Sequence, residues 1–102
     1  MKVAFKTKEL EQLYTSPLNE IRGKKKFSRE VIKQYQAKVR ILTVIDKLKD
    51  LYPIRSLNFE ALSGNRKGQF SIRLNKQFRL IIIEVEDELI EIEIIKISKH
   101  YE

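Results

Sequence analysis

The spacing of the apolar residues changes once along this chain, and that change constrains the fold more than any other feature. Between residues 31 and 51 the apolar residues recur every three or four positions, which predicts one long amphipathic helix that ends near Leu51, just before Pro53. The members of this stripe are Val31, Tyr35, Val39, Leu42, Ile45 and Leu48. From residue 69 onward apolar and polar residues alternate instead, as in β-strands. We therefore expect an α+β fold, with helices first and a meander last.

Three predicted strands follow one another in the second half of the chain. Gln69 to Asn75 and Gln77 to Glu86 form a hairpin through an Asn-Lys turn, with Phe70 and Ile72 on one face and Ser71 and Arg73 on the other. An Asp-Glu turn then leads into a strand from Leu89 to about Ser98. These strands predict a mainly antiparallel sheet.

The first half supplies the elements that cover this sheet. Lys2 to Phe5 predicts a short strand. Thr7 is the predicted N-cap of a first helix, which ends at Ser16-Pro17. Ser28 is the predicted N-cap of the long helix. The fold class is thus a short N-terminal strand and two helices packed on a mainly antiparallel sheet. At 102 residues we expect one domain, residues 1–102.

The net charge of +7 is distributed unevenly along the chain. Residues 1–40 carry eleven Lys and Arg against four acids, residues 41–83 eight against three, and residues 84–102 two against seven, giving +7, +5 and −5. A polyanion would therefore meet mainly the first four-fifths of the chain, which favours nucleic acid or an acidic protein as partner.

Composition excludes several classes of function. The chain has no cysteine and one histidine, so a zinc site of Cys and His is excluded, and we expect no metal. The Gly-rich stretch GNRKG lacks the Gly-Lys-Ser/Thr ending of a phosphate-binding loop, and we expect no small-molecule cofactor. No apolar run approaches the ~20 residues of a membrane span, and no secretory signal begins the chain, so we expect no membrane association and a cytoplasmic location.

Several polar residues lie near the ends of the predicted strands. Arg79 falls between Phe78 and Leu80, a costly position for a charge unless it meets an anion. With Glu60 upstream and His100 at the other end of the chain, it suits metal-free RNA cleavage. That reaction needs a base for the 2′-hydroxyl proton, a cation for the phosphoryl oxygens and an acid for the leaving 5′-oxygen.

The stretch EALSGNRKGQFSIRLNKQFRLI, residues 60–81, resembles the core of the RelE/ParE superfamily of toxins from type II toxin-antitoxin modules, in its HigB branch. The resemblance extends over essentially the whole chain. It implies a RelE-like, microbial ribonuclease-type fold and a ribosome-dependent endoribonuclease acting on mRNA. It also implies a cognate antitoxin, a HigA-like helix-turn-helix protein.

Two features depart from the HigB pattern. The Asp-Tyr-His that ends the last strand of HigB proteins is replaced by Lys96, Ile97 and Ser98, and Ser63 replaces a lysine before the first core glycine. The ending ISKHYE instead resembles the YoeB branch. That resemblance assigns Glu60 as general base, Arg79 as phosphate stabiliser, His100 as general acid and Tyr101 as an orienting or base-stacking residue.

The candidate RNA-binding residues are all cations. They are Lys24, Lys25, Lys26, Arg29, Lys33, Arg66, Lys67 and Arg73. The Lys24–Lys26 run and its basic neighbours either bind ribosomal RNA phosphates or are solvated, and Arg73 either contacts RNA or pairs with an outward acid such as Glu91. Two other functions stay open: a non-enzymatic ParE-like inhibitor of DNA gyrase, and a degenerate toxin that acts only in a repressor complex with its antitoxin.

Overall fold

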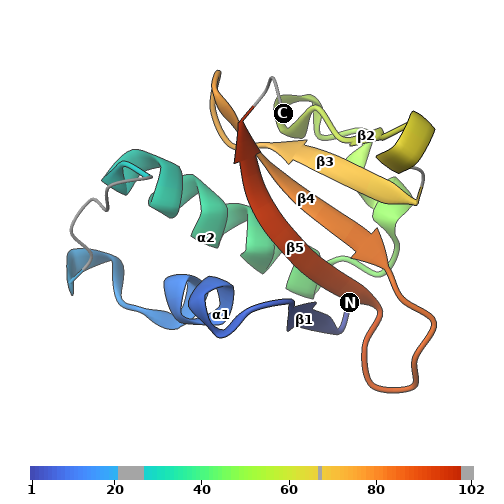
Figure 1. Cartoon of the computed structure of the whole chain (residues 1–102), viewed down its shortest axis with the longest axis horizontal. Coiled ribbons are helices and arrows are strands. Elements are labelled where there is room, and N and C mark those ends of the chain that lie inside the picture. The colour runs from blue at the N-terminus through green and yellow to red at the C-terminus, as the bar shows by residue number, and fades with distance from the viewer. Residues whose placement is uncertain (21–26, 67, 100–102) are drawn as a thin grey trace.

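The computed structural model describes residues 1–20, 27–66 and 68–99. In these residues the strands form one mixed sheet with the order β1-β5-β4-β3-β2 (Figure 1). The strands are β1 (Val3–Phe5), β2 (Glu60–Ala61), β3 (Gln69–Arg73), β4 (Phe78–Glu84) and β5 (Ile92–Lys99). The α-helices are α1 (Lys8–Thr15) and α2 (Arg29–Val44), and short 3₁₀ helices span Leu18–Glu20, Leu48–Leu51, Arg55–Leu57 and Gly64–Arg66.

Both α-helices begin where the sequence predicts. The Thr7 hydroxyl accepts a hydrogen bond from Leu10 N, and the Ser28 hydroxyl accepts one from Val31 N, each at 3.2 Å. These side chains satisfy amide groups that a helix start leaves without an intrahelical partner. Neither α1 nor α2, in the part of the chain that the structure describes, is long and apolar enough to cross a membrane.

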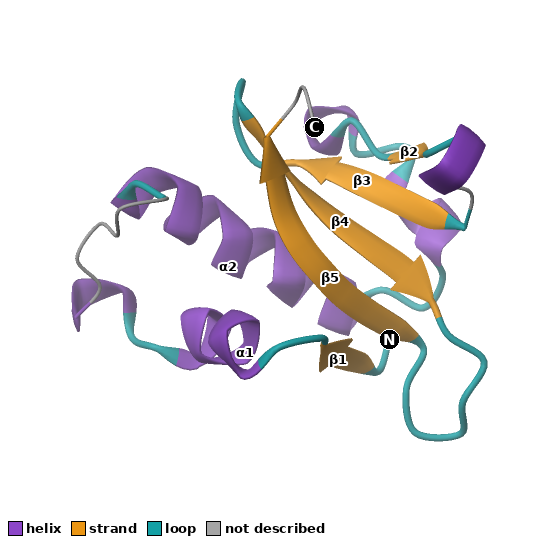
Figure 2. Cartoon of the chain, in the orientation of Figure 1, coloured by secondary structure: helices purple, strands orange, loops and turns teal. Residues whose placement is uncertain are grey.

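The core lies between the two α-helices and one face of the sheet (Figure 2). Tyr35 of α2 is fully buried there, and its hydroxyl donates a 2.7 Å hydrogen bond to the Leu10 carbonyl of α1. Burial, reinforced by nearby Tyr14, raises the pKa of the Tyr35 hydroxyl well above its ordinary value. The hydroxyl therefore stays neutral and ties α1 to α2.

The long helix ends earlier than the apolar spacing predicts, and the expected end near Leu51 is wrong. Helix α2 stops at Val44, Ile45 adopts an extended conformation with φ −72° and ψ 157°, and Leu48 and Leu51 lie in a separate 3₁₀ helix. The amino group of Met1 donates to the carbonyls of Leu42, Thr43 and Ile45 at 3.1, 3.2 and 2.7 Å. These contacts satisfy carbonyl groups at the helix end, so the same apolar spacing continues into the core without a continuous helix.

The sheet is mainly antiparallel, as predicted, because only β1 pairs with β5 in parallel among the described strands. Strand β4 ends at Glu84 and β5 begins at Ile92, so both are shorter at the connecting loop than predicted. Within that loop the Asp87 carboxylate accepts from Leu89 N at 2.7 Å, and Leu89 is 79% exposed. The local turn thus removes Leu89 from the strand.

Cross-strand register separates two faces of the sheet. Ile72 lies opposite Leu80, and both are in the core beneath the helices. The neighbouring positions point the other way, since successive side chains in a strand alternate. Ser71 and Arg73 of β3 and Arg79 of β4 therefore lie on the outer face of the sheet, as the alternation in the sequence predicts.

Candidate active site

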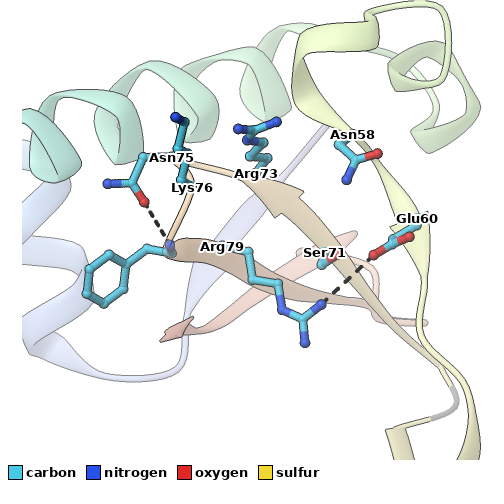
Figure 3. A pocket seen from close by; sticks show the side chains of 8 residues that line it. Asn58, Glu60, Ser71, Arg73, Asn75, Lys76 and Arg79 are labelled. Carbon is cyan, nitrogen blue, oxygen red and sulfur yellow. Dashed lines mark hydrogen bonds and ion pairs between the residues drawn. The ribbon is translucent and has the colours of Figure 1, made fainter. Parts of the chain in front are cut away.

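A cleft of about 360 Å³ opens beside the β3–β4 hairpin, and most of its charged side chains come from the outer face of the sheet (Figure 3). Its lining joins residues from β2, β3, β4 and the connecting turns. The lining residues are Asn58, Glu60, Ser71, Arg73, Asn75, Lys76, Phe78 and Arg79. Two of the predicted catalytic residues, Glu60 and Arg79, and one predicted RNA-binding residue, Arg73, are thus brought together.

Arg79 and Glu60 point toward each other across the cleft (Figure 3). Nη1 of Arg79 lies 3.9 Å from Oε1 of Glu60, and the two side chains are 16% and 52% exposed. Glu60 of β2 lies opposite Ser71 of β3, which lies opposite Ile81 of β4, two residues beyond Arg79. The small Ser71 side chain in the middle strand leaves room for the arginine to reach the glutamate.

The Glu60 carboxylate thus lowers the predicted free-energy cost of placing the charge of Arg79 in an apolar strand. The contact is long for an ion pair and Glu60 is half exposed, so it stabilises the fold little. Its effect is positional: it holds a guanidinium and a carboxylate together in a cleft that solutes can enter.

Arg73 lies directly opposite Arg79 in the β3–β4 ladder. Glu91, the example given of an acid that could pair with Arg73, does not do so. It immediately precedes β5, on the side of β4 away from β3, and its Oε1 accepts from Lys2 N at 2.9 Å. With Lys76, the described lining of the cleft holds three cations and one carboxylate. Like charges placed opposite each other in a sheet repel, so this arrangement favours a bound anion.

The turn between β3 and β4, which lines the cleft, is held by Asn75. Its Oδ1 accepts hydrogen bonds from Gln77 N at 2.9 Å and from Phe78 N at 2.7 Å. The Phe78 ring also contacts the Phe27 ring edge-on, with 5.5 Å between centroids, just before α2 begins. The core therefore fixes the hairpin end from which Lys76 and Arg79 extend.

Asn58 holds the opposite wall in a left-handed conformation, with φ 44° and ψ 47°. Asparagine adopts this region more readily than most residues. The next residue, Phe59, turns into the core and stacks on Phe70, with 5.3 Å between ring centroids and 9° between planes. This reversal lets Phe59 enter the core while Asn58 and Glu60 remain in the cleft.

Five of the lining residues are not among the predicted site residues: Asn58, Ser71, Asn75, Lys76 and Phe78. The sequence predicts the Asn-Lys pair only as a turn and Ser71 only as an outward position. An asparagine just before a strand was the available signal for Asn58. Their common membership depends on pairing between strands, which local patterns do not encode.

The other predicted cations lie elsewhere or outside the described residues. Arg29 and Lys33 line a second cleft, of about 320 Å³, with Leu18 and Glu30, and Nη2 of Arg29 donates to the Leu18 carbonyl at 3.4 Å. Arg66 ends the 3₁₀ helix before β3 and is in neither described lining. The predicted site residues that lie outside the described residues are Lys24, Lys25, Lys26, Lys67, His100 and Tyr101.

The arrangement defines what this cleft can do chemically. The two arginines can neutralise a phosphate, and Glu60 is the carboxylate in its described lining that can accept a proton. The described residues contain no group of three or more His, Asp or Glu side chains placed to hold a metal ion.

Solved structures share this architecture. The YoeB/ParE toxin from Agrobacterium tumefaciens superposes with a TM-score of 0.57 at 15% identity, covering 99% of this chain and 100% of that one. The YoeB-YefM complex from Staphylococcus aureus superposes with a TM-score of 0.57 at 21% identity, covering 99% of this chain and 98% of that one. The solution structure of the conserved hypothetical protein HP0894 from Helicobacter pylori superposes with a TM-score of 0.54 at 19% identity, covering 100% of this chain and 97% of that one. The chain therefore has the fold of YoeB/ParE-type toxins.

The family is shown by sequence. Residues 3–97 match a family model described as the RelE-like toxin of type II toxin-antitoxin system HigB. No curated protein matches the chain. The protein belongs to this HigB-like family of RelE-like toxins, as the resemblance of residues 60–81 implies.

Proposed function

We propose that this toxin is an endoribonuclease that cleaves mRNA on the ribosome without a metal or cofactor. The observation that carries the proposal is the contact between Arg79 and Glu60 in an open cleft whose other charges are positive. A guanidinium beside a carboxylate supplies both phosphate binding and proton acceptance at one phosphodiester.

In the proposed reaction Glu60 takes the proton of a ribose 2′-hydroxyl, and the resulting oxygen attacks the adjacent phosphorus. Arg79, with Arg73 opposite it, neutralises the charge that develops on the non-bridging oxygens. The bond from phosphorus to the 5′-oxygen breaks, and His100 donates the proton that this oxygen needs. The products are a 2′,3′-cyclic phosphate, which hydrolyses to a 3′-phosphate, and a 5′-hydroxyl, with Tyr101 orienting or stacking on a base.

The proposal includes two kinds of partner. One is a cognate antitoxin, a HigA-like helix-turn-helix protein, in keeping with the family and with a fold neighbour that is a YoeB-YefM complex. The other is RNA, both the mRNA in the cleft and ribosomal RNA phosphates on the basic surface. The cluster of Arg29 and Lys33 beside a second cleft supports the ribosomal contact.

Mapping mRNA 5′-ends after brief induction tests the activity. We expect Glu60→Gln to lower cleavage by about 10²–10⁴-fold because it removes the base, and Arg79→Lys by about 10²–10³-fold because it removes the planar guanidinium. Glu86→Gln, an exposed acid in the β4–β5 loop, is the matched control and keeps full cleavage. Unchanged cleavage in both cleft variants would overturn the proposal.

A second function is favoured by one specific observation. Ser98, which stands where HigB proteins carry a histidine, lies directly opposite Arg79 and is fully buried. A hydroxyl at this position is a poor proton donor near neutral pH, which favours a ParE-like gyrase inhibitor that does not cleave RNA. Induction would then cause DNA damage with intact mRNA, whereas a degenerate toxin would leave cell growth unchanged.

A further inference from the structure

The charged side chains of the active-site cleft follow one another along β3. Glu60 of β2 lies opposite Ser71. Arg73, two residues further along β3, lies opposite Arg79, and two strand residues correspond to about 7 Å. Lys76 extends from the turn three residues beyond Arg73 (Figure 3). The cleft therefore has an acidic end at β2, two arginines in the middle and a basic end at the β3–β4 turn.

Two of the three cations in the cleft have no acidic partner. Arg79 contacts Glu60 at 3.9 Å, whereas no carboxylate among the described residues contacts Arg73 or Lys76. Both of these side chains are exposed, and in Figure 3 they extend from the hairpin in the same direction, while Arg79 extends toward Glu60. Cations that extend together without an anion repel each other, so a bound anion lowers the free energy of this arrangement.

A single phosphodiester does not balance the positive charge of the cleft. The proposed reaction places the scissile phosphate, which carries one negative charge, at the level of Arg73 and Arg79. The charge of Lys76 then remains unbalanced by any group of the described lining. A polynucleotide strand carries one negative charge per nucleotide, so the neighbouring phosphate of the same strand is the group that balances Lys76.

The order of the charges gives the strand a direction. The 2′-hydroxyl that Glu60 deprotonates in the proposed reaction belongs to the nucleotide on the 5′ side of the scissile phosphate. The leaving nucleotide, on the 3′ side, therefore extends toward the other end of the cleft, where Lys76 lies. The phosphate beside Lys76 is thus the one that follows the scissile phosphate along the strand.

We propose that Lys76, together with Arg73, binds the phosphate on the 3′ side of the leaving nucleotide, so that RNA runs 5′ to 3′ from Glu60 to Lys76. The direction rests on the proposed function, whereas the second phosphate subsite rests on the charges of the turn. A lysine binds phosphate as a point charge, and such a contact positions a strand without reading its sequence. The substrate is then a strand that continues at least one phosphate beyond the cleaved bond.

Binding of dinucleotides that cannot be cleaved tests the subsite without any assay of RNA cleavage. The probes are the 2′-deoxy dinucleotide TpT, its 5′-phosphate pTpT and its 3′-phosphate TpTp. The two phosphorylated probes carry the same charge and differ only in the end that bears the added phosphate. Their affinities for the full chain are measured by NMR titration at low salt. Lys76→Gln removes the proposed contact, and Lys8→Gln, an exposed lysine at the start of α1, is its matched control.

We expect the wild type to bind TpTp about three- to tenfold more tightly than TpT, because the added phosphate lies beside Lys76. The added phosphate of pTpT lies at the Glu60 end of the cleft, so pTpT should gain less than about twofold over TpT. In Lys76→Gln the advantage of TpTp over pTpT should disappear, whereas Lys8→Gln should keep it.

Three outcomes would overturn the subsite: equal or larger gains from pTpT, an advantage of TpTp that Lys76→Gln retains, and absence of TpTp binding. Failure of the enzyme proposal gives a different result. The probes lack the 2′-hydroxyl, so a protein that leaves mRNA intact but prefers TpTp through Lys76 has the subsite without the proposed reaction. A protein that cleaves mRNA but binds TpTp and pTpT alike has the reaction without the subsite.

Discussion

Arg73 and Arg79 occupy directly opposed positions on β3 and β4, so two guanidinium groups stand on the same face of the sheet. Repulsion between them is offset in part by Glu60, whose Oε1 is 3.9 Å from Nη1 of Arg79. Arg73 is exposed, so its charge contributes less to the stability of the fold than the charge of Arg79, which contacts Glu60. The pair is therefore a place where ligand binding and stability oppose each other.

Removing the charge of Arg73 should stabilise the free protein. We expect Arg73→Thr to raise the free energy of unfolding by about 0.2–1 kcal/mol in low salt, and by less in about 0.5 M salt, where charges are screened. Urea denaturation at both salt concentrations measures this. Lys76→Thr removes a charge three residues from Arg73 in the same cleft. It is the control and should show a smaller gain. A loss of stability at both salts would contradict the repulsion.

The left-handed conformation of Asn58 predicts that glycine is tolerated at this position better than valine, as measured by the free energy of unfolding. With φ 44°, Asn58→Gly should leave the free energy of unfolding within about 0.5 kcal/mol, whereas Asn58→Val should lower it by roughly 1–2 kcal/mol. A β-branched residue at exposed Ser56 is the comparison and should have little effect. Similar stabilities for the glycine and valine variants would show that the conformation relaxes.

The buried hydroxyl of Tyr35 should make stability fall at alkaline pH. Its pKa is raised in the folded state, so its contribution is complete below the ordinary tyrosine pKa of about 10. As the pH rises past that value, the unfolded chain loses the proton while the folded chain keeps it, and the free energy of unfolding decreases until the folded pKa is reached.

Tyr35→Phe isolates this effect. It should lower stability at neutral pH by about 0.5–1.5 kcal/mol, because the partly buried Tyr35–Leu10 hydrogen bond of 2.7 Å is lost. The difference between wild type and variant should then shrink as the pH rises above about 10. Denaturant midpoints between pH 7 and 11 measure it, and a constant difference would contradict the neutral buried hydroxyl.

The second basic cluster should contribute salt-dependent binding to ribosomes. If Arg29 and Lys33 contact phosphates, Arg29→Gln and Lys33→Gln should each reduce the slope of log affinity against log salt concentration by about 1. Co-sedimentation with ribosomes over a range of salt measures the slope. Lys8→Gln, which removes the same charge at the start of α1, should leave it unchanged. Equal slopes for all three variants would place the contact elsewhere.

The fold was largely predictable because its determinants are local. Thr7 and Ser28 cap helices through amides three residues away, and the alternation of Phe70 to Arg73 separates core from outer face within one strand. The helix end was not predictable in the same way. Apolar spacing at Ile45 and Leu48 only indicates which side chains face the core, and both a helix and an extended link with a 3₁₀ turn satisfy it.

The candidate site shows the same division. From the sequence, Glu60, Arg73 and Arg79 are residues able to take part in RNA binding or cleavage. The resemblance of residues 60–81 to a known core indicates the family whose model residues 3–97 match. The contributions of Asn58, Ser71, Asn75 and Lys76 came only with the structure. Each of them acts through a partner on another strand or through a backbone conformation.

The sequence by itself therefore determined the order of the two α-helices and the longer strands, the two faces of β3 and the sign of the charge. Only the tertiary structure decided that Arg73 opposes Arg79 and that Glu60 reaches Arg79 over Ser71. The physical reason is range. Helix and strand periodicities arise from neighbours along the chain, whereas strand register and the cleft depend on residues that meet only when the sheet and the helices pack.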